Sequence, residues 1–262
     1  MKPYYETENG KLYQCDNVEY LKSIDNDSFD MTVTSPPYDN LRDYKGYSWN
    51  FEELAKELYR TTKQGGVVVW VVGDATINGS ETGSSFRQAL YFMECGFNLH
   101  DTMIWEKRVP PCNNKRYEPA FEYMFILVKG KIEKFNGIKT KRLIKDKRTE
   151  KQFQRTKDKK TYKQYANKSD SVLKTNIWII NNRDVSDHDH PAIFPEKLAH
   201  DHIISWSNEN DIVFDPFMGS GTIAKMAERS KRRWIGCEIS KEYCDITKHR
   251  IENEIQQLKL NF

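Results

Sequence analysis

The feature that most constrains the fold of this chain is a regular alternation between two kinds of segment. Short runs of apolar, β-branched and aromatic residues alternate with longer amphipathic stretches, a pattern typical of a mainly parallel sheet with helices on both faces. The predicted strands are 12–15, 31–34, 66–72, 99–105, 121–128, 211–214 and 233–237. The predicted helices are 18–23, 51–62, 84–95, 195–205, 222–229 and 241–258. The expected fold class is α/β, with a doubly wound, mainly parallel, seven-stranded sheet.

The alternation is interrupted once, after Val128. Polar, lysine-rich sequence follows until a short apolar run at 176–180. A chain of 262 residues has room for one large domain with an insertion. We therefore expect residues 1–128 and 176–262 to be two halves of one domain, and residues 129–175 to be an insertion.

Charge is distributed unevenly, although the net charge is only +3. Residues 129–174 contain 17 Lys and Arg against five Asp and Glu, so this segment carries +12 and the remainder −9. An acidic body with one basic segment is the footprint of a protein that binds nucleic-acid phosphates. A solvated, disordered linker has the same composition, and this alternative stays open. Candidate DNA contacts in the segment are Lys141, Arg142, Lys147, Arg148 and Arg155.

Composition also excludes several classes of protein. No apolar run approaches the roughly 20 residues of a membrane span, and the first residues lack the apolar stretch of a signal peptide. A cytoplasmic location without membrane partners is therefore expected. The five cysteines are scattered and form no C-x-x-C pair, so they fit neither a disulfide framework nor a zinc site.

A candidate catalytic loop, Ser35-Pro36-Pro37-Tyr38, follows the predicted strand 31–34. The carboxyl ends of strands are where α/β sheets place their chemistry. Two consecutive prolines fix two φ angles and remove two N–H donors, so the loop presents its carbonyl groups rigidly as acceptors. An ordinary turn after a strand is the alternative interpretation.

Such a loop suits an exocyclic amino group of a base, whose lone pair is delocalised into the ring. If the Ser35 side chain and the Pro36 carbonyl accept hydrogen bonds from the NH₂ group, its lone pair turns toward a methyl donor. Tyr38 offers a flat face for a base turned out of the duplex.

A candidate ligand-binding turn lies near the other end of the chain. The predicted strand 211–214 runs into Asp215-Pro-Phe-Met-Gly219-Ser-Gly221-Thr222, which leads into a helix. The glycines permit a tight turn and close approach of a ligand, and Asp215 suits a cationic ligand such as S-adenosylmethionine. Glu238 ends the next strand, at the spacing of a ribose-binding carboxylate. Alternatively, either carboxylate could cap the following helix.

Together these motifs resemble the β subgroup of the DNA amino-methyltransferases, which act on adenine N6 or cytosine N4. That family has a catalytic [DNS]-P-P-[YF] loop and a D-P-F-x-G-S-G-T cofactor turn, and both are complete here in the same order. The resemblance implies a Rossmann-like, class I S-adenosylmethionine-dependent methyltransferase fold, with S-adenosylmethionine as cofactor and double-stranded DNA as partner.

The resemblance also assigns residues. The catalytic residues would be Ser35, Pro36, Pro37 and Tyr38. The cofactor would contact Asp16, Thr34, His190, Phe194, Pro195, Asp215, Pro216, Phe217, Gly219, Ser220, Gly221, Thr222 and Glu238. Residues 1–128 become the catalytic half, 129–175 the target-recognition region and 176–262 the cofactor-binding half. Arg42 and Tyr47 follow the catalytic loop and would touch DNA or form a polar surface loop.

Several questions stay open at this level. Ser35 favours cytosine N4, with adenine N6 as the alternative, because serine at the first loop position is more frequent in cytosine enzymes. Amino methylation of RNA or of a protein glutamine, and a non-catalytic DNA-binding role, are the rival functions. A homodimer and a cognate restriction endonuclease are both compatible with the sequence. No metal is expected, since Asp187–His190 alone makes a poor site, and Pro111-Cys112 matches the cytosine-C5 nucleophile only as a dipeptide.

Overall fold

The computed structural model describes residues 1–37, 49–107, 115–141, 170–181 and 194–260. The chain forms two compact units, one of Met1–Asn136 with Asn176–Phe262 and a smaller one of Gly137–Thr175. The strands of the larger unit are β1 (Tyr5–Glu6), β2 (Gly10–Gln14), β3 (Phe29–Thr34), β4 (Thr62–Val72), β5 (Thr76–Ile77), β6 (Ser80–Glu81), β7 (Asn98–Glu106), β8 (Phe121–Val128), β11 (Ile177–Ile179), β12 (Ile212–Asp215) and β13 (Arg233–Glu238). Its helices are α1 (Asn17–Lys22), α2 (Phe51–Thr61), α3 (Ser84–Glu94), α4 (Glu196–Trp206), α5 (Thr222–Arg229) and α6 (Lys241–Leu260).

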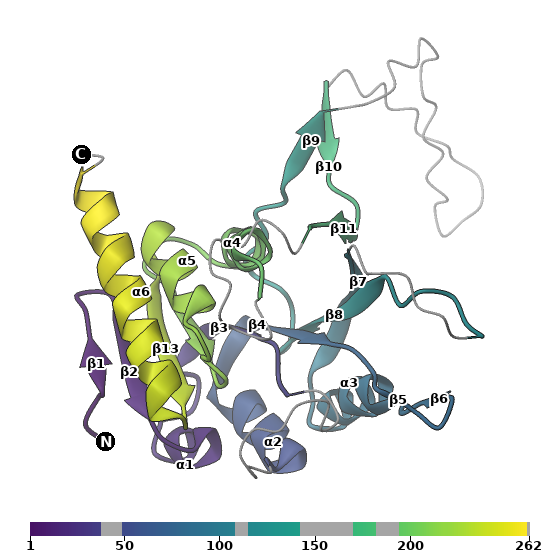
Figure 1. Ribbon diagram of the computed structural model, residues 1–262, viewed down its shortest axis with the longest axis horizontal. Helices are drawn as coiled ribbons and strands as arrows, with labels where there is room; N and C mark the ends of the chain where they lie inside the picture. The colour runs from purple at the N-terminus through teal and green to yellow at the C-terminus, as the bar shows by residue number, and fades with distance from the viewer. Residues whose placement is uncertain (38–48, 108–114, 142–169, 182–193, 261–262) are drawn as a thin grey trace. The chain divides into compact units, whose positions relative to one another are not determined.

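Nine strands form the central sheet, in the order β1-β2-β13-β12-β3-β4-β8-β7-β11 (Figure 1). The pairs are parallel except at β1–β2 and on both sides of β8. All seven predicted strands are present and make up the interior of the sheet, which confirms the mainly parallel α/β prediction. Two short edge strands, β1 and β11, extend the sheet beyond the prediction.

Helices cover both faces of the sheet. The helices α1, α2 and α3 pack side by side on one face, and α4, α5 and α6 on the other. Each predicted helix is present and differs from its predicted bounds by at most a few residues. This is the doubly wound arrangement that the alternating pattern predicts.

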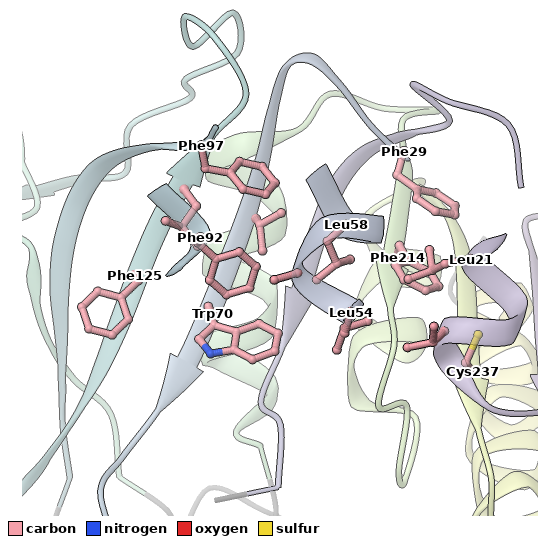
Figure 2. Packing of buried hydrophobic residues seen from close by; sticks show 14 of the residues in the cluster. Leu21, Phe29, Leu54, Leu58, Trp70, Phe92, Phe97, Phe125, Phe214 and Cys237 are labelled. Atoms are coloured by element: carbon pink, nitrogen blue, oxygen red, sulfur yellow. The ribbon is translucent and has the colours of Figure 1, made fainter. Parts of the chain in front are cut away.

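The core beneath α1–α3 is built largely from aromatic and aliphatic side chains. Trp70 on β4 is fully buried and meets the Phe92 ring at 5.0 Å (Figure 2). Leu54 and Leu58 on α2 face the sheet beside them. At the other end of the same cluster, Phe29 stacks on Phe214 at 4.4 Å. That contact joins β3 to β12, the two strands whose ends carry the candidate site.

The smaller unit begins at Gly137, eight residues after the predicted boundary. Lys129 is buried, and its ammonium group donates to Asp27 and to the Thr62 carbonyl. Lys134 bridges Asp30 and Asp211 at 2.9 and 2.7 Å. These two basic residues therefore hold the larger unit together and are not part of the smaller one.

The described part of the smaller unit is a hairpin. Strand β9 (Lys139–Lys141) pairs antiparallel with β10 (Ser171–Leu173), with Lys141 opposite Ser171. Lys141 is exposed. Within the described ranges, no helix is long and apolar enough to cross a membrane.

Candidate active site

Four adjacent parallel strands bring the predicted site residues to one edge of the sheet. Asp16 follows β2, Glu238 ends β13, Asp215 ends β12 and Thr34 ends β3. In the sheet these strands lie next to one another in the order β2-β13-β12-β3. Residues far apart in the sequence thus meet at the carboxyl edge, where open α/β sheets bind their ligands.

Asp215 lies in a buried, hydrogen-bonded position. Its Oδ1 accepts the hydroxyl of Thr34 at 2.7 Å and the backbone N–H of Phe217 at 3.0 Å. Burial raises the pKa of the Asp215 carboxyl to about 7, against the lowering effect of these two hydrogen bonds, and the nearby Glu238 charge raises it further. A buried carboxyl of this kind is stabilised in its ionised form by a cation brought close to it. The alternative role as a cap of α5 does not apply, because Gly221 occupies that position.

Glu238 holds the glycine turn from the neighbouring strand. Its Oε2 accepts the N–H of Gly219 and its Oε1 that of Ser240, both at 2.8 Å. Burial raises the pKa of this carboxyl as well, and the backbone hydrogen bonds lower it. Ser240 directly precedes α6, so this hydrogen bond fixes the entry to the helix and caps none of the N–H groups of Lys241–Leu260. The bond to Gly219 fixes the turn.

The turn itself uses backbone conformations that favour glycine. Gly219 and Gly221 have φ angles of 53° and 80°, in the left-handed region. A Cβ on Gly221 would lie 2.7 Å from a side-chain carbon of Thr247. Gly221 is therefore required by close packing against α6 as well as by the turn.

Sequence reasoning missed the residues that support this turn from behind. On α6, Thr247 donates to the Gly219 carbonyl at 2.7 Å, and Arg250 donates to the carbonyl and hydroxyl of Ser220 at 2.7 and 2.8 Å. Arg250 also pairs with Glu196 at the start of α4. From the opposite side, Asn17 donates to the Pro216 carbonyl at 3.1 Å. No local motif marks these positions, because their partners are distant in sequence.

The start of the catalytic loop follows directly from β3. Pro36 is buried, whereas Ser35 and Pro37 are partly exposed. Tyr38, Arg42 and Tyr47 lie outside the described residues. The chain returns at Trp49, whose ring packs against Phe217 of the cofactor turn at 5.1 Å and against Trp70 at 6.2 Å.

The remaining predicted cofactor contacts are placed at helix starts. Asp16 caps α1, and its Oδ1 accepts the N–H groups of Val18 and Glu19. Pro195 is the residue before α4 and is buried, with Phe194 beside it partly exposed. Asp16 and Pro195 therefore each occupy the N-cap position of a helix, α1 and α4 respectively. The predicted cofactor residue His190 lies outside the described residues.

Other predictions fall outside the part of the chain that the structure describes. These are Asp187–His190, Pro111-Cys112, and the DNA candidates Arg142, Lys147, Arg148 and Arg155. Within the described ranges, no group of His, Cys, Asp and Glu side chains is arranged to hold a metal ion.

Comparison with known proteins identifies the family. The model of the N6/N4 DNA methylase family matches residues 29–249, which include both the loop after β3 and the turn after β12. This chain is a DNA methylase of that family. It is 56% identical to the orphan methyltransferase M.BamHII of Bacillus amyloliquefaciens, over 89% of this chain and 92% of that protein.

Solved structures share the fold of this methylase. The PvuII DNA methyltransferase (cytosine-N4-specific) superposes with a TM-score of 0.72 at 23% identity, covering 97% of this chain and 93% of that one. A putative DNA modification methylase from Thermus thermophilus, solved with S-adenosyl-L-methionine, gives a TM-score of 0.64 at 24% identity, covering 94% and 96%. The methylase described here is an S-adenosylmethionine-dependent enzyme that acts on DNA.

The site fits that cofactor. Asp215 is buried and Glu238 is half-buried, and both carboxyl groups have a raised pKa and lie beside a glycine turn. S-adenosylmethionine brings a sulfonium and an amino group. The cofactor, when bound, supplies the methyl group.

Proposed function

We propose that this methylase transfers the methyl group to the exocyclic amino nitrogen of a base turned out of the duplex, and that the base is cytosine, methylated at N4. Adenine N6 is the alternative. The observation that carries the proposal is the contact between Thr34 and Asp215. The proposed catalytic loop starts at Ser35, the residue after Thr34. The hydrogen bond from Thr34 therefore places the start of this loop beside the Asp215 carboxyl, which we propose receives the positive charge of the cofactor.

The chain's own residues would act by orientation. Ser35 and the Pro36 carbonyl accept hydrogen bonds from the NH₂ group, which directs its lone pair toward the methyl group. Tyr38 stacks on the base. Pro36 and Pro37 themselves carry no amide hydrogen that could compete with the NH₂ group for these acceptors. No covalent enzyme intermediate is required. The amino nitrogen would gain a bond to the methyl carbon as the bond between that carbon and the donor sulfur breaks, the demethylated cofactor would leave, and one amino proton would pass to water.

Residues 129–175 are proposed to recognise the target sequence. The smaller unit, Gly137–Thr175, contains most of the basic residues of that stretch. The proposed phosphate contacts are Lys141, Arg142, Lys147, Arg148 and Arg155, with Arg42 and Tyr47 contributing from the segment after the catalytic loop. Phosphate contacts of this kind position a protein on DNA, and base contacts specify the sequence.

The choice of cytosine rests on Ser35, through the family tendency of serine at that loop position. A cytoplasmic location follows from the DNA substrate. Since the relative at 56% identity is an orphan methyltransferase, we propose that this methylase also works without a dedicated restriction endonuclease.

The decisive experiment incubates the pure protein with labelled S-adenosylmethionine and DNA of varied sequence, then analyses the nucleosides by mass spectrometry. We expect N4-methylcytosine from the wild type and none from Pro36→Ala. Pro119→Ala is the matched control, because Pro119 is exposed and distant in sequence from both motifs. N6-methyladenine alone would overturn the choice of base. Methylation of RNA or protein in preference to DNA, or of nothing, would overturn the proposed substrate or the catalytic role.

A further inference from the structure

Three cysteine side chains lie around the strand end that carries Glu238. Cys237 precedes Glu238 in β13, and Cys15 follows β2, the neighbouring strand. Cys244 lies in the first turn of α6, and its thiol donates to the Glu238 carbonyl at 3.7 Å. All three are free thiols. Cys237 and Cys244 are fully buried, whereas Cys15 is partly exposed, so Cys15 is the member of the group that a small molecule in solution meets first.

The strand register places Cys15 and Cys237 side by side. Tyr13 lies opposite Cys237 in the parallel pair of β2 and β13, and the pairing continues because the Cys15 N–H donates to the Glu238 carbonyl at 3.0 Å. Since side chains alternate along a strand, Cys15 points to the same face as Tyr13. Both pack, with Cys237, on the core cluster of Figure 2. The Cys237 thiol donates a hydrogen bond to the Cys15 sulfur, so the two sulfurs are already in contact.

This hydrogen bond gives the two thiols different acidities. It lowers the pKa of the Cys15 thiol, against the raising effect of burial and of the nearby Asp16 charge. Burial raises the pKa of Cys237 well above its usual range, and the hydrogen bond that it donates raises it further. Cys95 is partly exposed as Cys15 is, but burial raises its pKa. Because the thiolate is the reactive form of cysteine, Cys15 should react with an oxidant faster than Cys95 does.

Cys15 also lies between two proposed cofactor contacts. Asp16 is the next residue along the chain, and Glu238 is bonded to the Cys15 N–H through its backbone and to the Gly219 N–H through its side chain. The sulfurs of a disulfide are about 2.05 Å apart, much closer than two hydrogen-bonded sulfurs. A bond between Cys15 and Cys237 would therefore draw the end of β2 toward β13 and displace both carboxylates.

We propose that Cys15 and Cys237 form a reversible disulfide, made by hydrogen peroxide, that switches off cofactor binding. The proposal rests on the proposed placement of the cofactor beside Asp16 and Glu238. The Cys15 thiolate attacks one oxygen of the peroxide, so that an S–O bond forms, the O–O bond breaks and hydroxide leaves. The Cys237 thiol then attacks the Cys15 sulfur, so that the S–S bond forms and the S–O bond breaks. The two thiols lose two electrons and two protons, and the peroxide is reduced to two molecules of water.

The test uses the full chain, first reduced and then treated with hydrogen peroxide. Peptide mapping by mass spectrometry should find a disulfide between Cys15 and Cys237, and Cys95 should still be a thiol. Isothermal titration calorimetry, after the peroxide is removed, should show that the affinity for S-adenosylmethionine has fallen at least about tenfold and that dithiothreitol restores it. Saturating S-adenosylmethionine during the treatment should slow formation of the disulfide, because it holds Asp16 and Glu238 in place.

Two variants remove the proposed switch, and a third is their matched control. After peroxide, Cys15→Ser and Cys237→Ser should each keep the cofactor affinity of their own untreated samples. Cys95→Ser changes another partly exposed thiol and should lose affinity on oxidation as the wild type does. The proposal would be overturned by absence of the disulfide, by a disulfide that leaves affinity unchanged, by faster oxidation of Cys95, or by equal loss in Cys15→Ser and the wild type. None of these readouts depends on methylation, so the proposed function can fail or hold independently.

Discussion

The hydroxyl of Thr34 donates to the carboxylate of Asp215 across 2.7 Å, in a place where both side chains are almost completely buried. Thr34 ends the strand that leads to the proposed catalytic loop, and Asp215 ends the strand that leads to the proposed cofactor turn. One hydrogen bond therefore joins the two motifs. Anything that alters it should alter cofactor binding.

Replacement of Thr34 by valine removes that donor with little change in shape. Because the hydrogen bond lowers the pKa of Asp215, its loss should raise this pKa further and leave the carboxyl mostly protonated at pH 7. We expect cofactor affinity at pH 7 to fall roughly tenfold, as for other hydrogen bonds to charged groups, and to recover near pH 9. Isothermal titration calorimetry at both pH values measures this affinity. Thr34→Ser, which keeps the hydroxyl, should bind as the wild type does, and equal loss in both variants would argue against this role.

Cofactor affinity should depend on pH through Asp215. The pKa of this carboxyl is raised to about 7, and a cationic ligand favours the ionised form, so binding near pH 7 should release about half a proton. Below pH 7 the affinity should fall by up to about tenfold per pH unit. Calorimetry in buffers of different ionisation enthalpy measures the number of protons released per cofactor bound. In Asp215→Asn the affinity should be lower and independent of pH, whereas an unchanged pH profile in this variant would assign the effect to another group.

The same carboxyl should limit the stability of the cofactor-free protein. Its pKa is higher in the folded state than the ordinary value of 3.8, so the folded state retains a proton that the unfolded state loses. Stability contributed by this group is therefore full below about pH 4 and is lost as the pH rises through about 7. Asp215→Asn should melt several degrees above the wild type at pH 8 and at nearly the same temperature at pH 4. Thermal unfolding by circular dichroism measures this, and a variant less stable than the wild type at pH 8 would be inconsistent with it.

Arg250 should position the cofactor turn without touching the reacting atoms. Arg250→Met keeps the apolar stem but removes both hydrogen bonds to Ser220, so we expect the dissociation constant of the cofactor to rise about tenfold. The KM for the cofactor should rise more than kcat falls. Arg229→Met is the matched control, because Arg229 pairs with Glu254 at 2.7 Å and contacts the same acidic residue, Glu196, but has no bond to the turn. If both variants lost the same affinity, the loss would come from the ion pairs with Glu196 and not from the hydrogen bonds to Ser220.

Trp70 should be the most costly single side chain to truncate in the core beneath α1–α3. Its side chain is fully buried, and its indole N–H donates to Gln88 at 2.8 Å. Trp70→Ala should lower the free energy of unfolding by about 3–5 kcal/mol, whereas Trp70→Phe should cost less because most of the ring volume remains. Urea unfolding measures both. Leu260→Ala, at an 85% exposed position, should change little.

The fold was largely predictable because its strands and helices carry strong local patterns. Several interior strands contain continuous apolar runs, such as 66–72 in β4, and such runs favour extended structure in the local sequence alone. The short strands β1, β5, β6, β9, β10 and β11 were not predicted. They have two or three residues each, mostly exposed, so their extended form depends on pairing with a neighbour. Lys134 shows a similar limit, since its partners Asp30 and Asp211 are far along the chain.

At the site, the residue types were predictable from the sequence, but the hydrogen bonds that each residue makes were not. The carboxyls of Asp215 and Glu238 and the glycine turn all lie at the predicted edge. Asp16 caps α1 through a local contact with Val18 and Glu19, whereas the support given by Thr247 and Arg250 arises only from the tertiary structure. A hydrogen bond between α6 and the turn leaves no periodic signal in either segment.

The order of the strands also has a consequence for how the enzyme is made on the ribosome. Strands β12 and β13, translated last, insert between β2 and β3, which are translated near the beginning. Until they emerge, the two strands that connect β2 to β3 in the sheet are missing, and Asp215 and Glu238 are not yet in place at its edge. Such long-range pairing is slow and cooperative. A nascent or truncated chain should therefore bind no cofactor at all, so methylation begins only once synthesis has reached the last strand.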